Sequence, residues 1–438
     1  MTDTMDTTDS RNSREQPAMK QQEKREIQTL SSQKDYVIRV FEDPALIDAA
    51  QWNDLLESQF AATPFMRHEY LLALHRSASA CTETGWRAHF LTIFDGSTLV
   101  AACPLYRKSH SYGEYVFDWA WADAYQRHGL SYYPKLLNAV PFTPVPGSRL
   151  LARDFDGRRL LLRAMQQLAT DAKLSSAHVL FLDATDQQAA VAEGWMMRST
   201  VQFHWTNRVP APYADFADFL ATMQRDKRKK IQQERRRVTD AAVDFVELEG
   251  VAITQDDWEF FYRCYQQTYL EHRSTPYLSR DFFERMAQSM PENWLMFVAS
   301  HNGERIAASL VGIDPEHKVA FGRYWGAVAH LPCLHFEACY YRPLAWCIAN
   351  RYVRFEGGAQ GEHKMARGLL PVQTWSAHWL AHPQFAQAVA DFLSREDAGM
   401  ANYMDELNER RPFKLAGPAD AANGAANGAA PEPVSPPP

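Results

Sequence analysis

Apolar residues change their spacing along the chain in an order that occurs twice. In the first half, positions at helical spacing predict one helix over 45–60 and a second over 68–78. Alternating apolar positions then predict two strands, over 87–94 and 97–108, and the Asp-Gly dipeptide between them is typical of a hairpin turn. The first half therefore predicts two helices followed by a β-hairpin.

The second half repeats this order. Helical spacing predicts helices over 256–270 and 279–290, and two strands over 293–300 and 305–314 follow, joined at an Asn-Gly turn. A further strand is predicted over 319–327. The repetition predicts a mixed α/β (α+β) protein of two tandem domains. Each domain would hold a mixed, mostly antiparallel sheet flanked by helices.

The domain boundaries follow from composition. We place the first domain at 35–205 and the second at 206–410, with a basic helix over 225–238 near the start of the second. The segments 1–34 and 411–438 are poor in large apolar residues. They bury too little surface to offset the entropy of ordering, so we expect disordered tails.

The stretch 109–125 is unusually aromatic. Tyr115, Phe117, Trp119 and Trp121 alternate with other residues, which is the period of a strand. We therefore predict a strand here with large rings on one face. Superposing Phe117 on the phenylalanine at 321 also superposes Trp121 on a tryptophan, which agrees with a repeat.

Carboxylates lie on the opposite face of that predicted strand. Glu114 and Asp118 share this face, and His110 precedes it. Carboxylates so near apolar surface are costly unless they are hydrogen-bonded or used. We expect His110, Glu114, Asp118 and Trp121 to bind substrate in a cleft. The alternative is that the carboxylates accept hydrogen bonds from neighbouring tyrosines.

Charge and composition exclude several classes of protein. A net charge of −7 argues against a general nucleic-acid binder. The six cysteines show no C-x-x-C spacing, and no apolar run reaches the about 18 residues of a membrane span. We expect no metal site and a cytoplasmic location, either free or peripheral to the inner membrane.

Four stretches of the chain resemble one known family. They are 63–74 (TPFMRHEYLLAL), 106–125 (YRKSHSYGEYVFDWAWADAY), 132–147 (YYPKLLNAVPFTPVPG) and 356–371 (EGGAQGEHKMARGLLP). With the tandem halves, they resemble the FemAB-like predicted N-acyltransferases, a Fem-type branch of the GNAT acyltransferase superfamily. The resemblance implies paired GNAT domains and attack of an amine on an activated acyl group. It implies acyl-CoA, or in tRNA-using members an aminoacyl ester, as donor and no tightly bound cofactor.

One motif of ordinary GNAT enzymes is missing in its usual context. These enzymes hold the CoA pyrophosphate with backbone N–H groups at a helix N-terminus, in the pattern [QR]-x-x-G-x-[GA]. The match at 354–359 follows a predicted helix instead of preceding one. We therefore interpret it as chance, and Fem-type proteins generally lack this loop.

The segment 358–368 carries the main candidates for catalysis. It combines three glycines with Glu362, His363, Lys364 and Arg367. Glycine permits close approach of a ligand to the backbone, and histidine titrates near neutral pH. The resemblance places a substrate-contacting lysine at Lys364. We expect Lys364 and His363 to be catalytic and Glu362 and Arg367 to bind substrate; a solvated loop is the alternative.

Three further candidates lie on or after the strand 319–327. Glu337 has apolar and aromatic neighbours, which would raise its pKa and make it a possible base. An exposed glutamate at a helix start is the alternative. Arg323 and Trp325 share one face of the strand, where we expect them to bind substrate. Stacking on rings would also satisfy the arginine.

The basic run 225–238 has three possible ligands. It would bind the phosphates of the acyl donor, a tRNA backbone, or an anionic membrane surface. A solvated linker helix is the alternative.

These observations predict an N-acyltransferase that transfers an acyl group from acyl-CoA to an amine by direct attack. Acceptors that fit are a long-chain (sphingoid-type) amine or a cell-wall amine. One alternative is an aminoacyl-tRNA-dependent Fem-type transferase acting on a peptidoglycan precursor. The other is a non-catalytic module that binds an anionic partner.

Overall fold

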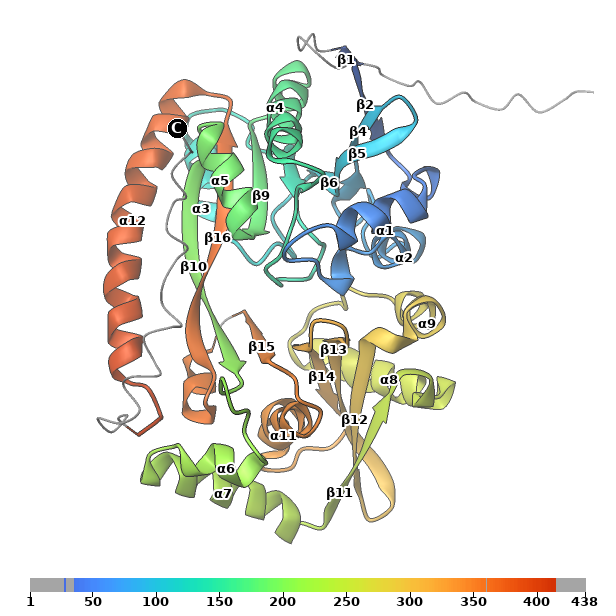
Figure 1. Ribbon diagram of the computed structural model, residues 1–438, viewed down its shortest axis with the longest axis vertical. Helices are drawn as coiled ribbons and strands as arrows, with labels where there is room; N and C mark the ends of the chain where they lie inside the picture. Colours follow the sequence, from blue (N-terminus) through green and yellow to red (C-terminus); the bar gives the residue numbers. More distant parts are fainter. Residues whose placement is uncertain (1–26, 29–34, 360, 415–438) are drawn as a thin grey trace, which may run out of the picture.

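The computed structural model shows two α/β halves joined by long strands (Figure 1). It describes residues 27–28, 35–359 and 361–414. The predicted tails, 1–34 and 411–438, lie mostly outside the described residues. In the parts of these tails that the structure describes, Ile27–Gln28 pair with the strand Tyr36–Phe41, and Phe413 forms a β-bridge with Met223.

The first half begins with a strand, two helices and a hairpin. Its elements are β1 (Ile27–Gln28), β2 (Tyr36–Phe41), α1 (Ala49–Glu57), α2 (His68–Arg76), β3 (Trp86–Ala88), β4 (Phe90–Asp95), β5 (Thr98–Cys103), β6 (Leu105–Lys108), α3 (Trp119–Arg127), β7 (Lys135–Asn138), β8 (Leu151–Ala152), α4 (Phe155–Asp171), β9 (Ser176–Leu182), α5 (Ala184–Ala192) and β10 (Met196–Thr206).

The second half follows the same order after two connecting helices. Its elements are α6 (Phe216–Ala221), α7 (Arg225–Asp240), β11 (Val243–Glu249), α8 (Gln255–Glu271), α9 (Arg280–Ser289), β12 (Trp294–His301), β13 (Glu304–Asp314), β14 (Val319–Ala327), α10 (Leu334–Phe336), the π-helical turn η5 (Glu337–Tyr341), α11 (Arg342–Ala349), β15 (Arg354–Ala359), the 3-10 helix η6 (Glu362–Arg367), β16 (Leu370–Leu380) and α12 (Pro383–Glu409).

The tandem architecture predicted from the sequence is confirmed. The order β2–α1–α2–β4–β5 recurs as β11–α8–α9–β12–β13, and both hairpins are antiparallel. The sheets are mixed and mostly antiparallel, with helices packed against them.

One sheet runs through both halves. Its strand order is β11-β12-β13-β14-β15-β10-β16-β9-β7-β6-β3, and a second sheet has the order β1-β2-β4-β5-β8. β10 and β16 pair with each other in the middle of the large sheet and reach β15 on one side and β9 on the other. Figure 1 shows these two strands spanning the halves. The halves are therefore joined by backbone hydrogen bonds.

Helices cover both faces of the second half's sheet. Met296 and Val298 of β12 pack in one apolar cluster with α8 and α9, whereas Leu295 and Phe297 pack in another with η5 and α11. Successive side chains of a strand point to opposite faces, so α8 and η5 lie on opposite sides of the sheet. Each such buried side chain contributes roughly 1.5–3 kcal/mol.

The predicted aromatic strand over 115–121 is wrong. Residues from Trp119 onward form α3, and only loop precedes it. Trp121 and Tyr125, one helical turn apart, pack against α12, whereas Trp119 stays exposed. The alternating rings therefore belong partly to a loop and partly to helix α3. Phe117 lies in the loop whereas Phe321 lies in strand β14, so the two positions are not equivalent.

Candidate active site

A gap opens in the large sheet where β14 and β15 separate. Their parallel ladder ends at the pair Phe321–Glu356, although β14 continues to Ala327. From Gly322 onward, the edge of β14 that faces β15 has no neighbouring strand among the described residues. An unpaired strand edge presents backbone donors and acceptors to a ligand.

Two pockets meet at this gap from opposite faces of the sheet. The first, of about 330 Å³, lies on the α8 side, where Tyr265 and Tyr269 line it. The second, of about 130 Å³, lies on the η5 side beside Cys339 and Tyr340. Both are lined by Gly322, Arg323, Tyr324, Trp325 and Gly357. The two faces of the sheet thus share one junction.

A third space continues from the junction along the loop after β14. It has a volume of about 470 Å³ and is lined by the loop 327–336 together with Thr268, His272 and Trp325. Trp325 lines all three spaces. The predicted binding residue Trp325 therefore lies where the three spaces meet.

Gly357 packs closely against Phe203 and Leu369 behind the junction. A Cβ atom at this position would lie 2.5 Å from Leu369 Cδ2 and 2.9 Å from the carbonyl oxygen of Phe203. A side chain would clash there, so glycine is required for this packing.

Arg323 is the charged residue that lines both pockets. Its Nη2 donates hydrogen bonds to the Phe142 oxygen (2.9 Å), Thr143 Oγ1 (3.1 Å) and the Tyr324 hydroxyl (3.0 Å), and its guanidinium lies over the ring of Phe65. Its Nε is buried without a hydrogen-bond partner, and no ion pair holds it within the described part of the chain. Stacking satisfies it in part, and a positive charge remains for a ligand.

Lys364 lies in η6 beside the gap. Its side chain is buried, and Nζ donates a hydrogen bond to the oxygen of Gly358 at 3.2 Å. Burial lowers the pKa of Lys364 to about 8. At neutral pH the ammonium is therefore the prevailing form, and Gly358 beside it lines the first pocket.

His363 is an exposed residue that contacts the wall of the second pocket through Tyr340. Its Nε2 lies 3.2 Å from the hydroxyl of Tyr340, which lines that pocket. Burial lowers the pKa of His363, and the cations of Arg367 and Lys364 add to this. The imidazole is therefore neutral at pH 7 and able to accept a proton.

Glu337 is held by two arginines. Both of its carboxylate oxygens accept hydrogen bonds from Arg235 of α7 (3.0–3.2 Å), and Arg342 donates another at 3.1 Å. Charge-assisted hydrogen bonds from two guanidinium groups occupy this carboxylate, so the geometry favours an ion-pair role. The predicted role as a base stays a prediction.

The other two candidates of the segment contact the protein itself. Arg367 donates to Glu234 Oε2 of α7 at 3.1 Å and stacks on the ring of Phe336. Glu362 is exposed and accepts a hydrogen bond from Tyr403 of α12 at 2.7 Å. Arg367 therefore fastens η6 to the basic helix.

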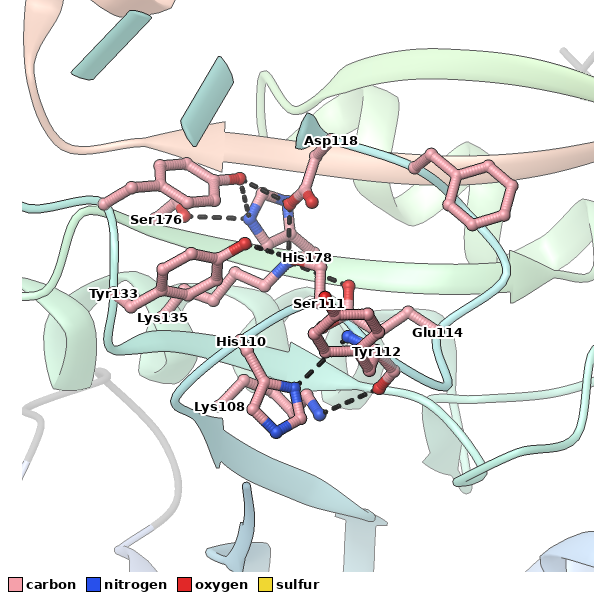
Figure 2. Close-up of polar contacts among 12 residues, drawn as sticks. Lys108, His110, Ser111, Tyr112, Glu114, Asp118, Tyr133, Lys135, Ser176 and His178 are labelled. Atoms are coloured by element: carbon pink, nitrogen blue, oxygen red, sulfur yellow. Dashed lines mark hydrogen bonds and ion pairs between the residues drawn. The ribbon is translucent and has the colours of Figure 1, made fainter. Parts of the chain in front are cut away.

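Two of the remaining candidates, Glu114 and Asp118, contact Lys135 in the first half (Figure 2). Lys135 Nζ donates to Glu114 Oε2 at 2.8 Å, to Asp118 Oδ2 at 2.5 Å and to Ser111 Oγ at 2.8 Å. All three charged side chains are buried. The expected cleft role is untested, and the structure places both carboxylates in an ion-pair cluster.

The cluster shifts the pKa values of its members in opposite directions. Burial raises the pKa of Glu114 to about 7, with repulsion from Asp118 adding to it. Burial also opposes ionisation of Asp118, but the Lys135 ammonium outweighs it and lowers the pKa of that carboxyl. Burial lowers the pKa of Lys108, which lies 3.6 Å above the Trp86 ring, to about 7.

The cluster supports one wall of the junction. Tyr115, directly after Glu114, lines the first pocket. His110 accepts a hydrogen bond from the backbone of Tyr112 at 3.2 Å (Figure 2), and Trp121 stacks near His378. None of His110, Glu114, Asp118 and Trp121 lines the pockets at the gap. They anchor the loop that does.

Two site residues were missed by the sequence analysis. Lys135 lies in an apolar strand between rings, and a buried lysine requires a carboxylate partner; this was the available signal. Glu356 begins the family-like stretch 356–371 but was treated as part of a chance motif. That motif, 354–359, forms β15 and not a loop at a helix N-terminus, which agrees with the interpretation as chance.

The described residues contain neither a metal-binding cluster nor a membrane-spanning helix. No cluster of three histidine, cysteine, aspartate or glutamate side chains there is arranged to hold a metal ion. No helix in that part of the chain combines the length and apolarity needed to cross a bilayer.

Comparison with known protein families identifies the family to which the chain belongs. Residues 44–415 match the model of the FemAB-like family, described by peptidoglycan biosynthesis/recognition. The match covers most of the chain, so the chain belongs to the FemAB-like family. It is thereby a member of a transferase family.

Several solved structures are similar to the chain at low sequence identity. FemX is 8% identical, covers 78% of this chain and 98% of its own, and has a TM-score of 0.48. L-PGS from Bacillus licheniformis is 11% identical, with coverages of 80% and 98% and a TM-score of 0.48. A tandem GNAT protein from the clavulanic acid biosynthesis pathway is 14% identical, with coverages of 80% and 99% and a TM-score of 0.43. Among curated proteins, none matches the chain.

Proposed function

We propose that this chain forms amides by transferring an acyl group from a CoA thioester to an amine at the junction beside Arg323. The amine nitrogen attacks the carbonyl carbon, a C–N bond forms, and the C–S bond breaks as the tetrahedral intermediate collapses. The thiolate leaves and takes up a proton. The observation that carries the proposal is that two pockets from opposite faces of the sheet share one residue set.

This arrangement suits two substrates that must meet end to end. A donor on one face and an acceptor on the other reach the same point without passing each other. Holding both reactants at that point supplies much of the rate, because it replaces a bimolecular encounter by an oriented one.

The positive charges at the junction complement the negative charge that develops on the substrate during the reaction. The carbonyl oxygen becomes an oxyanion, and the guanidinium of Arg323 has a buried Nε without a partner. The Lys364 ammonium lies beside Gly358, on the same rim. Fixed donors aimed at an oxyanion are worth about 10²–10³-fold in rate.

The lining favours a donor or acceptor with apolar length. Tyr115, Phe142, Tyr265, Tyr269 and Trp325 line the first pocket. Aromatic walls bury apolar chains well. A long-chain amine or a cell-wall amine therefore fits as acceptor, and acyl-CoA fits as donor.

The basic helix α7 offers a surface for an anionic partner. Arg225, Lys229, Lys230, Arg236 and Arg237 are exposed on it, while Arg235 and Glu234 fasten it to η5 and η6. An anionic membrane would gain about 1 kcal/mol per cation and bring a lipid acceptor to the cleft. Replacing the five exposed cations by glutamine should abolish sedimentation with phosphatidylglycerol vesicles. Unchanged sedimentation would contradict this contact.

Release of free thiol tests the proposed reaction. Purified protein is mixed with a panel of acyl-CoAs and amines, and the products are identified by mass spectrometry. Amine-dependent thiol release with a matching amide is expected. Transfer only from aminoacyl-tRNA, abolished by RNase, would select the tRNA-dependent alternative. No transfer from either donor, with vesicle or RNA binding intact, would select a non-catalytic binding module.

A further inference from the structure

The proposed reaction needs a group that takes up a proton. An amine is largely protonated at neutral pH, and its nitrogen attacks only after losing that proton. Glu337 is occupied by Arg235 and Arg342. Another carboxylate, Glu356, lies at the point where β14 and β15 separate.

Glu356 is buried on the face of the sheet that α8 and the first pocket occupy. Its partner across the ladder is Phe321, which packs in the apolar cluster on the α8 side of the sheet. The guanidinium of Arg323 lies over the ring of Phe65, which belongs to the same cluster. Only 3% of Glu356 is exposed. Glu356 itself is not a lining residue of the first pocket, but the next two residues, Gly357 and Gly358, are, so the carboxylate lies directly behind the pocket wall.

One oxygen of this carboxylate has no hydrogen-bond partner. Oε1 accepts a bond from Arg354 Nε at 3.0 Å, whereas Oε2 is buried and unpartnered. His204 Nε2 lies 4.0 Å from Oε2 and 3.2 Å from Gln202 Oε1. A buried acceptor left open is costly and is typical of functional sites.

The charged surroundings leave Glu356 able to take up and release a proton. Burial raises the pKa of Glu356 to about 7, although nearby guanidinium groups oppose the shift. Burial lowers the pKa of His204 to about 3, so it stays neutral. The titratable and charged groups around this site are His204 of β10, Arg354 of β15, Arg323 of β14, Arg149 after β7, and Lys364 of η6.

We propose that Glu356 accepts the proton of the substrate ammonium at the junction, so that the free amine attacks the acyl carbon. The carboxylate becomes a carboxylic acid, and the amine loses its second N–H proton after the C–N bond forms. That proton goes to the leaving thiolate. The proton on Glu356 then passes to solvent before the next turnover. This inference rests on the proposed function.

The test is the pH dependence of a glutamine variant. Glu356→Gln keeps the shape of the side chain but accepts no proton. The rate of amide formation should fall by about 10²–10⁴-fold at pH 7, and the rise in kcat/KM as pH increases through about 7 should disappear. Glu356→Asp should restore part of the rate and the rise. Glu316→Gln, an exposed residue before β14, is the matched control and should behave as the wild type.

A measurement on the protein alone separates the possible failures. Infrared difference spectra between pH 5 and pH 9 should contain carboxylic-acid bands from the buried carboxyls that titrate near pH 7, which are Glu114, Asp186 and Glu356. The contribution of Glu356 should be missing from the spectrum of Glu356→Gln, whereas the other two remain. The inference is overturned if the spectrum of the variant loses no carboxylic-acid intensity, or if the variant keeps the wild-type rate and pH profile. A wild type with the band but no transfer to any amine would refute the proposed function and, with it, the catalytic role.

Discussion

Phe321 and Glu356 form the last rung of the parallel ladder between β14 and β15, and the two strands diverge directly after it. Everything proposed for this chain depends on that divergence. It frees one edge of β14, joins two pockets from opposite faces, and places Arg323 and Gly357 at their meeting point.

Removing the charge at the junction should slow the reaction. Arg323→Met keeps the apolar stem but removes the guanidinium that faces both pockets. We expect kcat to fall by about 10²–10³-fold. The KM for the acyl donor should change less, because the lost interaction is strongest in the transition state. Steady-state kinetics of thiol release measure both.

Arg395→Met, on the exposed surface of α12, is the control for this substitution. It should leave both constants unchanged. An Arg323→Met enzyme with wild-type kcat would remove Arg323 from the mechanism.

Lys364 should give the reaction an alkaline limit. Its pKa is about 8 because of burial, so the ammonium is present below this pH and is lost as pH rises through it. The rate should therefore fall above about pH 8 if the cation is required. In Lys364→Arg the charge persists, and the fall should move to higher pH. The pH–rate profiles of the two proteins provide the measurement.

A neutral replacement completes this series. Lys364→Met should be slow at all pH values and show no alkaline fall of its own, whereas Lys173→Met at an exposed position should match the wild type. An alkaline limb that survives in Lys364→Met at the same pH belongs to another group.

The Lys135 cluster should be important for stability. Lys135→Met leaves Glu114 and Asp118 buried without their cation. Breaking a buried ion pair by removing one partner costs about 3–5 kcal/mol. The free energy of unfolding in urea should fall by this amount.

An exposed ion pair supplies the comparison. Arg127 and Asp123 also form a pair, but 69% and 62% of their side chains are exposed. Arg127→Met should change the free energy of unfolding by less than about 1 kcal/mol. Equal effects of the two substitutions would show that the Lys135 cluster is not buried as described.

Gly326 should tolerate no side chain. A Cβ atom there would lie 1.9 Å from the carbonyl oxygen of Cys264 in α8. Gly326→Ala forces α8 away from β14, and we expect a loss of about 1–3 kcal/mol or more. Gly399→Ala is the control, because Gly399 lies in α12 with nothing within 4 Å. It should gain roughly 0.5–1 kcal/mol. Thermal unfolding compares the two, and a stable Gly326→Ala protein would contradict the close packing.

Local patterns were sufficient to predict the helices and hairpins but not the joined sheet. The turns at Asp95-Gly96 and Asn302-Gly303 lie where the sequence places them, because turn chemistry is local. Pairing of Met196 with His378, by contrast, joins residues far apart in the chain. No periodicity encodes such a contact.

The candidate site was predictable only in part. Arg323 and Trp325 line the junction and Lys364 lies beside it, and their roles in binding or catalysis stay predictions. Glu114 and Asp118 are predicted to lie on a strand because the aromatic residues between and after them alternate, but ion pairs with the buried Lys135 fix them instead. Their partner becomes visible only when the chain folds.

A crystal structure with a non-hydrolysable acyl-CoA thioether tests the central claim most directly. The acyl carbon should lie between Arg323 and Gly357, in the gap that opens after Phe321 and Glu356. Density for the acyl carbon in the first half, or on a surface away from the gap between β14 and β15, would contradict the proposed site.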